Sequence, residues 1–195
     1  MKIFGIGFHR TGTRSLRAFL DRLGFRAVHW PRSADGVCYE ALAIPHLHDR
    51  AAIIRALQPL LDSYTAFTDV PFPALYRELH THYQDARFIL VTRNRDQWWS
   101  SLAKHWRLSE AGFHALDPYE YLQYNLYSKE PLHYVTSNDR ELVIDIHARH
   151  IRSVVEHFGH LPGALLQVDL EDPGIARRVS RFLGVESDAG FPCVT

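Results

Sequence analysis

The sequence has almost no net charge, few cysteines and no long apolar run, and each shortage excludes a class of protein. Its 195 residues contain 22 Lys and Arg against 22 Asp and Glu. This balance argues against a chain that bulk charge holds to nucleic acid or to a membrane surface. No apolar stretch approaches the roughly 20 residues of a membrane span. The N-terminus also lacks the pattern of a signal peptide.

Cysteine is scarce, with only Cys38 and Cys193 present, and their spacing fits neither a metal site nor a disulfide framework. We expect free thiols in a cytoplasmic protein, with one long-range bridge as the alternative. Histidine is abundant, with 13 residues. No cysteine or carboxylate joins the histidine pairs at the ligand spacing of zinc, so we expect no metal.

Alternating strand and helix patterns run along the chain and predict an α/β fold. Leu16, Phe19, Leu20 and Leu23 recur at helical spacing, whereas Arg87–Thr92 is typical of a buried strand. Strands separated by helices predict one domain over residues 1–195, with a mostly parallel sheet and helices on both faces. The expected strands are 2–8, 25–30, 64–70, 87–92 and 164–170. Helices are expected near 16–23, 50–62, 96–107 with Asp96 as N-cap, 139–158 and 175–183, and irregular chain at 31–49 and 108–138.

A glycine-containing turn, GFHRTGTRSL at Gly7–Leu16, lies between the first strand and the first helix. In this context backbone N–H groups and the helix dipole favour an anion. Hydroxyl and cationic side chains strengthen the signal. The candidate donor-binding residues are Arg10, Thr11, Gly12, Thr13, Arg14 and Ser15. The alternative is an ordinary turn with N-capping threonines.

The turn departs from the nucleotide-kinase pattern G-x-x-x-x-G-K-[ST]. Thr13 occupies the lysine position and Arg14 the position of the Mg²⁺ ligand, while the cation has moved to Arg10. The turn therefore predicts an anion site without a metal. This suits a sulfuryl group, which carries less charge than a phosphoryl group.

Four stretches, in order along the chain, resemble the superfamily of sulfotransferases that use 3′-phosphoadenosine 5′-phosphosulfate (PAPS). They are GFHRTGTRSL, then LGFRAVHW with His29, then FTDVPFPALYREL followed by FILVTRNRDQWWSSL, and LLQVDLED continuing through FLGVES to FPCVT. They span nearly the whole chain. The resemblance implies a three-layer fold like that of P-loop NTPases, and PAPS as the sulfuryl donor.

The resemblance also implies that Arg93 and Ser101 hold the 3′-phosphate, since superfamily members place an Arg at a strand end and a Ser eight residues later. Two departures stand out. Many relatives have Lys at the position of Arg10, and the C-terminal Arg-Lys-Gly segment of cytosolic relatives is missing. The adenine contacts stay unassigned, because Trp98 and Trp99 are more typical of core than of stacking partners.

Sulfuryl transfer needs a cation for the leaving 5′-phosphate and a base for the acceptor's proton. We assign the cation to Arg10. Asp69 and His29 each end a predicted strand, and either is the base, with a slight preference for Asp69. A histidine base predicts titration near 6.5, and an aspartate base lower unless burial raises its pKa. His9, inside the turn, is a further candidate donor to the sulfuryl group.

The aromatic-rich segment 106–138 is expected either to cover the acceptor or to form core. A small-molecule, carbohydrate or lipid acceptor would fit such a lid. Two rival functions remain at this point. One is a nucleotide or small-molecule kinase, and the other is a module that binds 3′-phosphoadenosine 5′-phosphate (PAP) without catalysis.

Overall fold

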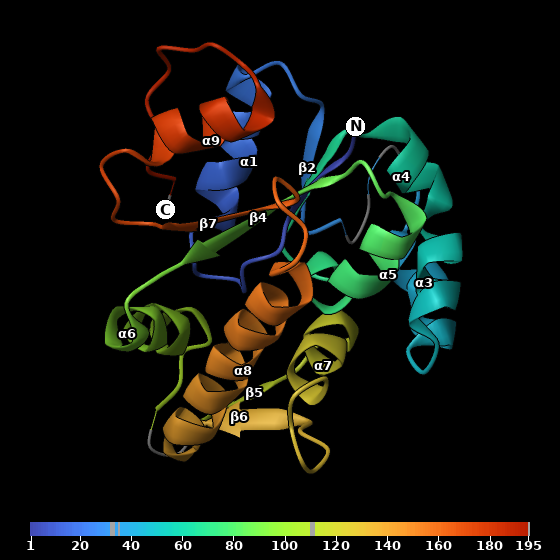
Figure 1. Cartoon of the computed structure of the whole chain (residues 1–195). Coiled ribbons are helices and arrows are strands. Elements are labelled where there is room, and N and C mark those ends of the chain that lie inside the picture. Colours follow the sequence, from blue (N-terminus) through green and yellow to red (C-terminus); the bar gives the residue numbers. More distant parts are fainter. Residues whose placement is uncertain (32–33, 35, 110–111, 195) are drawn as a thin grey trace.

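The main sheet has five parallel strands in the order β2-β3-β1-β4-β7. The computed structural model describes residues 1–31, 34, 36–109 and 112–194 (Figure 1). Parts of the segments 31–49 and 108–138, and Thr195 of the last motif, therefore lie outside the described residues. The strands are β1 (Ile3–Gly5), β2 (Ala27–His29), β3 (Ala66–Thr68), β4 (Arg87–Thr92) and β7 (Leu165–Asp169).

Helices cover both faces of this sheet, as the sequence predicts (Figure 1). Side chains alternate along β4, so that Phe88 and Leu90 enter the core of one face, and Ile89 and Val91 the core of the other. Helices α1 (Thr13–Arg22) and α9 (Ile175–Leu183) cover the Ile89 face. The other face carries α3 (Arg50–Ala56), α4 (Gln58–Ser63), α5 (Tyr76–His82), α7 (Pro118–Asn125) and α8 (Arg140–Phe158). No helix in the described part of the chain is long and apolar enough to cross a membrane.

The strand register brings the predicted site residues to one edge of the sheet. Gly5 of β1 is level with Thr68 of β3 and with Ile89 of β4, and His29 of β2 is level with Thr68. The segments that follow β1, β3 and β4 therefore leave the sheet on the same side. This edge is where α/β sheets bind ligands.

Three predicted segments differ from the structure. The helix expected over 50–62 is two helices, because Pro59 has no N–H to continue the hydrogen bonds of α3 into α4. The loop expected at 31–49 contains α2 (Tyr39–Ala43) and a 3₁₀ turn at Ile44–His46. The irregular region 108–138 contains α7 and an antiparallel pair, β5 (Phe113–Ala115) and β6 (Tyr134–Thr136).

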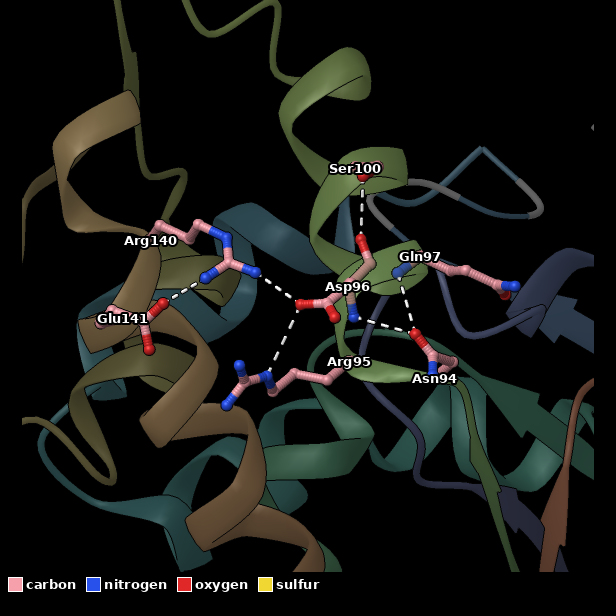
Figure 2. Close-up of polar contacts among 7 residues, drawn as sticks. All are labelled: Asn94, Arg95, Asp96, Gln97, Ser100, Arg140 and Glu141. Atoms are coloured by element: carbon pink, nitrogen blue, oxygen red, sulfur yellow. Dashed lines mark hydrogen bonds and ion pairs between the residues drawn. The ribbon is translucent and has the colours of Figure 1, made fainter.

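Helix α6 (Arg95–His105) is capped by Asn94, and not by Asp96 as expected (Figure 2). Asn94 Oδ1 accepts the N–H groups of Asp96 and Gln97 over 3.0 and 3.2 Å. The Asp96 carboxylate instead pairs with Arg140, at the start of α8. Because this pair is largely exposed, we assign the docking of α6 mainly to buried side chains, Trp98 and Leu102 among them.

The chain directly after β1 passes close to β4 at Gly7. A Cβ atom at Gly7 would lie 2.6 Å from the carbonyl oxygen of Val91, a backbone atom that cannot move aside. We expect Gly7→Ala to destabilise the fold by about 1–3 kcal/mol in urea unfolding. The control is Gly190→Ala, whose new Cβ would meet nothing within 4 Å. Equal stability of the two variants would contradict this close approach.

Candidate functional site

A cleft of about 970 Å³ opens where the strands end, a volume at the upper end of the usual range for small-molecule sites. Its walls come from the loop between β1 and α1, the ends of β2 to β4, α6, the loop between β7 and α9, and Gly190–Val194. The sequence-predicted residues that line it are Arg10, Gly12, Thr13, Arg14, Ser15, His29, Asp69, Arg93 and Ser101.

The loop between β1 and α1 has the form of an anion site. Arg10 and Gly12 have left-handed backbones, with φ of 67° and 90°. Within the described part of the chain no side chain caps the N-terminus of α1, so the N–H groups of its first turn are available to a bound anion. The left-handed backbone at Arg10 is uncommon for a residue other than glycine, and such residues are enriched at functional sites.

Thr11 is a candidate donor-binding residue from the sequence, but it does not line the cleft. Its hydroxyl donates to the Phe8 carbonyl over 2.6 Å, and its N–H donates to the same oxygen over 3.2 Å. The residue is fully buried. Thr11 therefore closes the turn from inside, a role that the sequence could not separate from ligand binding.

Arg10, Arg93 and Ser101 converge beside this loop. Arg10 Nε donates to Ser101 Oγ over 3.1 Å, and Arg93 Nη1 donates to the Arg10 carbonyl over 3.3 Å. Arg93 Nε is buried and has no hydrogen-bond partner among the described residues. Burial and the nearby Arg93 and Arg14 lower the pKa of Arg10. An anion would relieve this repulsion and satisfy the buried donor.

Asp69 and His29 form a contacting pair on the other side of Thr13. His29 Nε2 lies 3.4 Å from Asp69 Oδ2, and its Nδ1 lies 3.1 Å from Thr68 Oγ1. The Thr13 hydroxyl donates to Asp69 Oδ2 over 3.1 Å, which ties the carboxylate to the start of α1. The backbone of Asp69 is also left-handed, with φ of 73°.

Burial sets the ionisation of this pair. It raises the pKa of Asp69 to about 6, against the lowering effect of hydrogen bonds from Val70 N–H and Thr13. It also lowers the pKa of His29 to about 4, helped by Arg14 and Arg17. At pH 7 the pair is a carboxylate beside a neutral imidazole. The pKa of His29 therefore lies below the ordinary histidine value, and burial raises the pKa of Asp69 as the sequence analysis allowed.

Three further histidines, His9, His147 and His150, are buried in the interior. His9 Nε2 lies 2.9 Å from the Tyr124 hydroxyl, and burial lowers the pKa of His9 to about 4. His147 stacks on Trp98 at 4.0 Å between ring centroids, which confirms Trp98 as a core residue. Over the residues that the structure describes, no group of three or more His, Cys, Asp or Glu could hold a metal ion.

The aromatic segment 106–138 lies behind the loop and away from the cleft lining. Trp106 and Tyr124 are buried, and the Trp106 ring packs 5.3 Å from His9. Among the described residues of this segment, none lines the cleft. Phe113 and Tyr134 are exposed on β5 and β6. The lid over an acceptor stays a prediction.

A loop of this form between the first strand of a parallel sheet and a helix is typical of α/β domains that bind phosphate-containing ligands. Within that class, the family model described as a sulfotransferase domain matches residues 2–195, and the chain belongs to this family. The predicted superfamily is thereby confirmed.

A solved structure supports the fold. The crystal structure of a sulfotransferase from Alicyclobacillus acidocaldarius is similar, with a TM-score of 0.57 and 17% identity. The match covers 98% of this chain and 83% of that one. At this identity the likeness concerns the fold alone. The sequence matches none of the curated proteins compared with it.

Asp69→Asn should stabilise the protein at neutral pH. The pKa of Asp69 is about 6 in the folded state and 3.8 for an ordinary aspartate, the value taken for the unfolded state. Between pH 3.8 and about 6 the folded state therefore binds more protons than the unfolded state. Wild-type stability therefore falls as pH rises from about 4 to 6, by up to about 3 kcal/mol, and the variant lacks this fall. Urea unfolding of both proteins at pH 4 and 7.5 measures the difference. A variant less stable than wild type at pH 7.5 and equal to it at pH 4 would contradict the raised pKa.

Proposed function

We propose that the protein transfers the sulfuryl group of PAPS to a hydroxyl or amine of a small-molecule, carbohydrate or lipid acceptor. The observation that carries this proposal is a second anion site beside the first, in the same cleft. The loop over residues 10–15 is one site, and the buried, unpartnered Nε of Arg93 beside Ser101 is the other. A nucleotide with phosphates on both its 3′ and 5′ positions needs two such sites.

In this proposal the 5′-phosphosulfate lies against the first turn of α1, with Arg10 beside it. The 3′-phosphate lies at Arg93 and Ser101, and Arg93 can offer two parallel N–H donors to it. Membership of the sulfotransferase domain family supports the sulfuryl group as the group transferred.

The transfer step needs one bond made and one broken. The acceptor oxygen or nitrogen forms a bond to sulfur while the bond from sulfur to the bridging oxygen breaks, and its electron pair stays on the departing 5′-phosphate. The Arg10 guanidinium neutralises that charge as it develops. Asp69 takes the acceptor's proton.

Burial suits Asp69 to this task. A desolvated carboxylate is a stronger base, and the neutral acid that forms is the state that its surroundings favour. With a pKa of about 6, Asp69 is still ionised at neutral pH. His29, at the end of β2, is neutral at that pH. Its Nε2 contacts the Asp69 carboxylate and orients it.

Two alternatives are less well supported. A kinase of the P-loop type has a lysine at the position of Thr13 and a hydroxyl ligand of Mg²⁺ at the next position. Here the Thr13 hydroxyl donates to Asp69, and the next residue is Arg14, which has no hydroxyl. A module that only binds PAP would not need a base of raised pKa in the cleft. Detection of a sulfated product would distinguish the enzyme from a module that only binds PAP.

PAP should raise the melting temperature in the presence of EDTA, and AMP should do so much less, because only PAP fills both anion sites. Arg93→Ala should weaken PAP by about 10–150-fold, the loss expected for one charge-assisted hydrogen bond, and should weaken AMP far less, since AMP loses only the contact by which Arg93 supports the loop. Arg95→Ala is the matched control, since Arg95 is exposed and outside the cleft. A strict Mg²⁺ requirement, or equal shifts with AMP, would contradict the donor assignment.

The pH dependence of turnover should identify the base. With Asp69 as base, kcat rises with pH through a limb near 6, whereas a His29 base would place the limb near 4. Asp69→Asn should lower kcat by about 10²–10⁴-fold and remove the limb. The assay uses an acceptor found by mass-spectrometric screening for sulfated products. An Asp69→Asn enzyme within about tenfold of wild type, with unchanged PAP affinity, would exclude Asp69 as the base.

A further inference from the structure

Helix α7 presents two different faces to the rest of the protein. Glu120 and Tyr124, four residues apart, lie toward the loop between β1 and α1, because Tyr124 contacts His9 and the charge of Glu120 raises the pKa of His9. Tyr119 and Gln123 are also four residues apart and share a second face of the helix.

Three polar atoms on this second face are buried without a hydrogen-bond partner among the described residues. They are the Tyr119 hydroxyl and both the Oε1 and Nε2 atoms of Gln123. Each side chain is 0% exposed. A buried polar group without a partner is less favourable than an apolar group of the same shape, and such groups are rare in folded proteins. Three of them on one helix face indicate that a polar ligand binds there.

The same face lies beside the candidate base. Helix α7 packs against the 3₁₀ turn Phe72–Ala74, which begins three residues after Asp69. The charge of Asp117, the N-cap of α7, raises the pKa of Asp69. The charge of Glu40, from α2, raises the pKa of Tyr119. The three polar atoms therefore lie between α2 and the chain that leaves Asp69.

Access to this face depends on α2, because neither Tyr119 nor Gln123 lines the cleft. Helix α2 has five residues, and none of the described side chains caps its N-terminus. Leu42 and Ile44, near its end, are exposed. A helix this short, with part of its apolar surface in water, separates from the core more readily than the long elements do.

The chemistry of the unpartnered atoms indicates the class of ligand. The Gln123 amide offers two N–H donors and an acceptor, and the Tyr119 hydroxyl can donate and accept. The nearby carboxylates of Glu40 and Asp117 disfavour an anion. A phenol or a simple alcohol has one hydroxyl, which the transfer to sulfur already uses. A molecule with several hydroxyls has others left for Tyr119 and Gln123.

We propose that the acceptor is a neutral, carbohydrate-like polyol that binds between α2 and α7. One of its hydroxyls lies at Asp69, and others bond to Tyr119 and Gln123, which determine specificity. The inference rests on the proposed sulfuryl transfer and narrows its acceptor to one class.

Thermal unfolding tests whether the polar atoms are without partners. Gln123→Met and Tyr119→Phe nearly keep the shape of each side chain, so each variant should melt about 2–10 °C above wild type. The control is Tyr127→Phe, which should melt lower because the Tyr127 hydroxyl lies 3.2 Å from His150 Nδ1. Lower melting temperatures for both test variants would mean that the interior satisfies these atoms, and would overturn the site.

Turnover tests the class of acceptor. The probes are myo-inositol and methyl glucoside, with 4-methylphenol and 1-octanol as compounds with one hydroxyl. With PAPS, wild type should sulfate at least one of the first two and neither of the others. Gln123→Met should raise the KM of that polyol at least about fivefold, the loss of two neutral hydrogen bonds, with PAP affinity unchanged. Gln97→Met is the matched control, since Gln97 is exposed on α6 and outside the cleft lining.

The other results overturn the inference at different points. Sulfation of 4-methylphenol or 1-octanol alone would make the polyol class wrong while sulfuryl transfer stands. A higher melting temperature of Gln123→Met with an unchanged KM would mean that these atoms hold buried water only. Wild type that bound PAP but sulfated neither polyol would also exclude the class. Wild type that did not bind PAP would remove the proposed function itself.

Discussion

The conformation of the loop between β1 and α1 is the constraint on which the site depends. Two groups from a distant part of the chain hold it: the Trp98 indole donates to the His9 carbonyl over 3.0 Å, and Arg93 donates to the Arg10 carbonyl. Within the loop, the Thr11 hydroxyl and N–H both donate to the Phe8 carbonyl and close the turn. The N–H groups at the start of α1 are left for a ligand, and the contacts from Trp98 and Arg93 stabilise the left-handed turn at Arg10.

Opposite charges on the two sides of Thr13 follow from this loop. Arg10 and Arg93 are held together on one side although Arg93 lowers the pKa of Arg10. Asp69 is desolvated on the other side, and its nearest donor is the Thr13 hydroxyl. Both arrangements disfavour the unliganded protein. In the proposed function, an anion would lower the first cost and a proton from an acceptor would lower the second, so the same desolvation would favour binding and proton transfer.

The sequence predicts what local patterns determine, and misses what depends on burial. The bounds of β4 match the prediction, and the spacing of Arg93 and Ser101 does bring both to the loop. The raised pKa of Asp69 and the lowered pKa of His29 depend on desolvation by distant segments, which the sequence analysis could only leave open. Residue type alone could not decide whether Asn94 or Asp96 caps α6, since asparagine and aspartate are both good N-caps. The cleft wall at Gly190–Val194 has no periodicity that a sequence pattern could detect.

The loop between β1 and α1 is held from behind by the buried aromatic residues of a distant segment. His9 behind the loop contacts Tyr124 and Trp106 from the segment 106–138, so this segment supports the donor loop by packing. A change in these buried aromatic residues would therefore disturb donor binding before it altered the choice of acceptor. The exposed rings of Phe113 and Tyr134 are outside this packing. Substitutions at such exposed positions would therefore leave the anion loop, Arg93 and Asp69 of the proposed site in place.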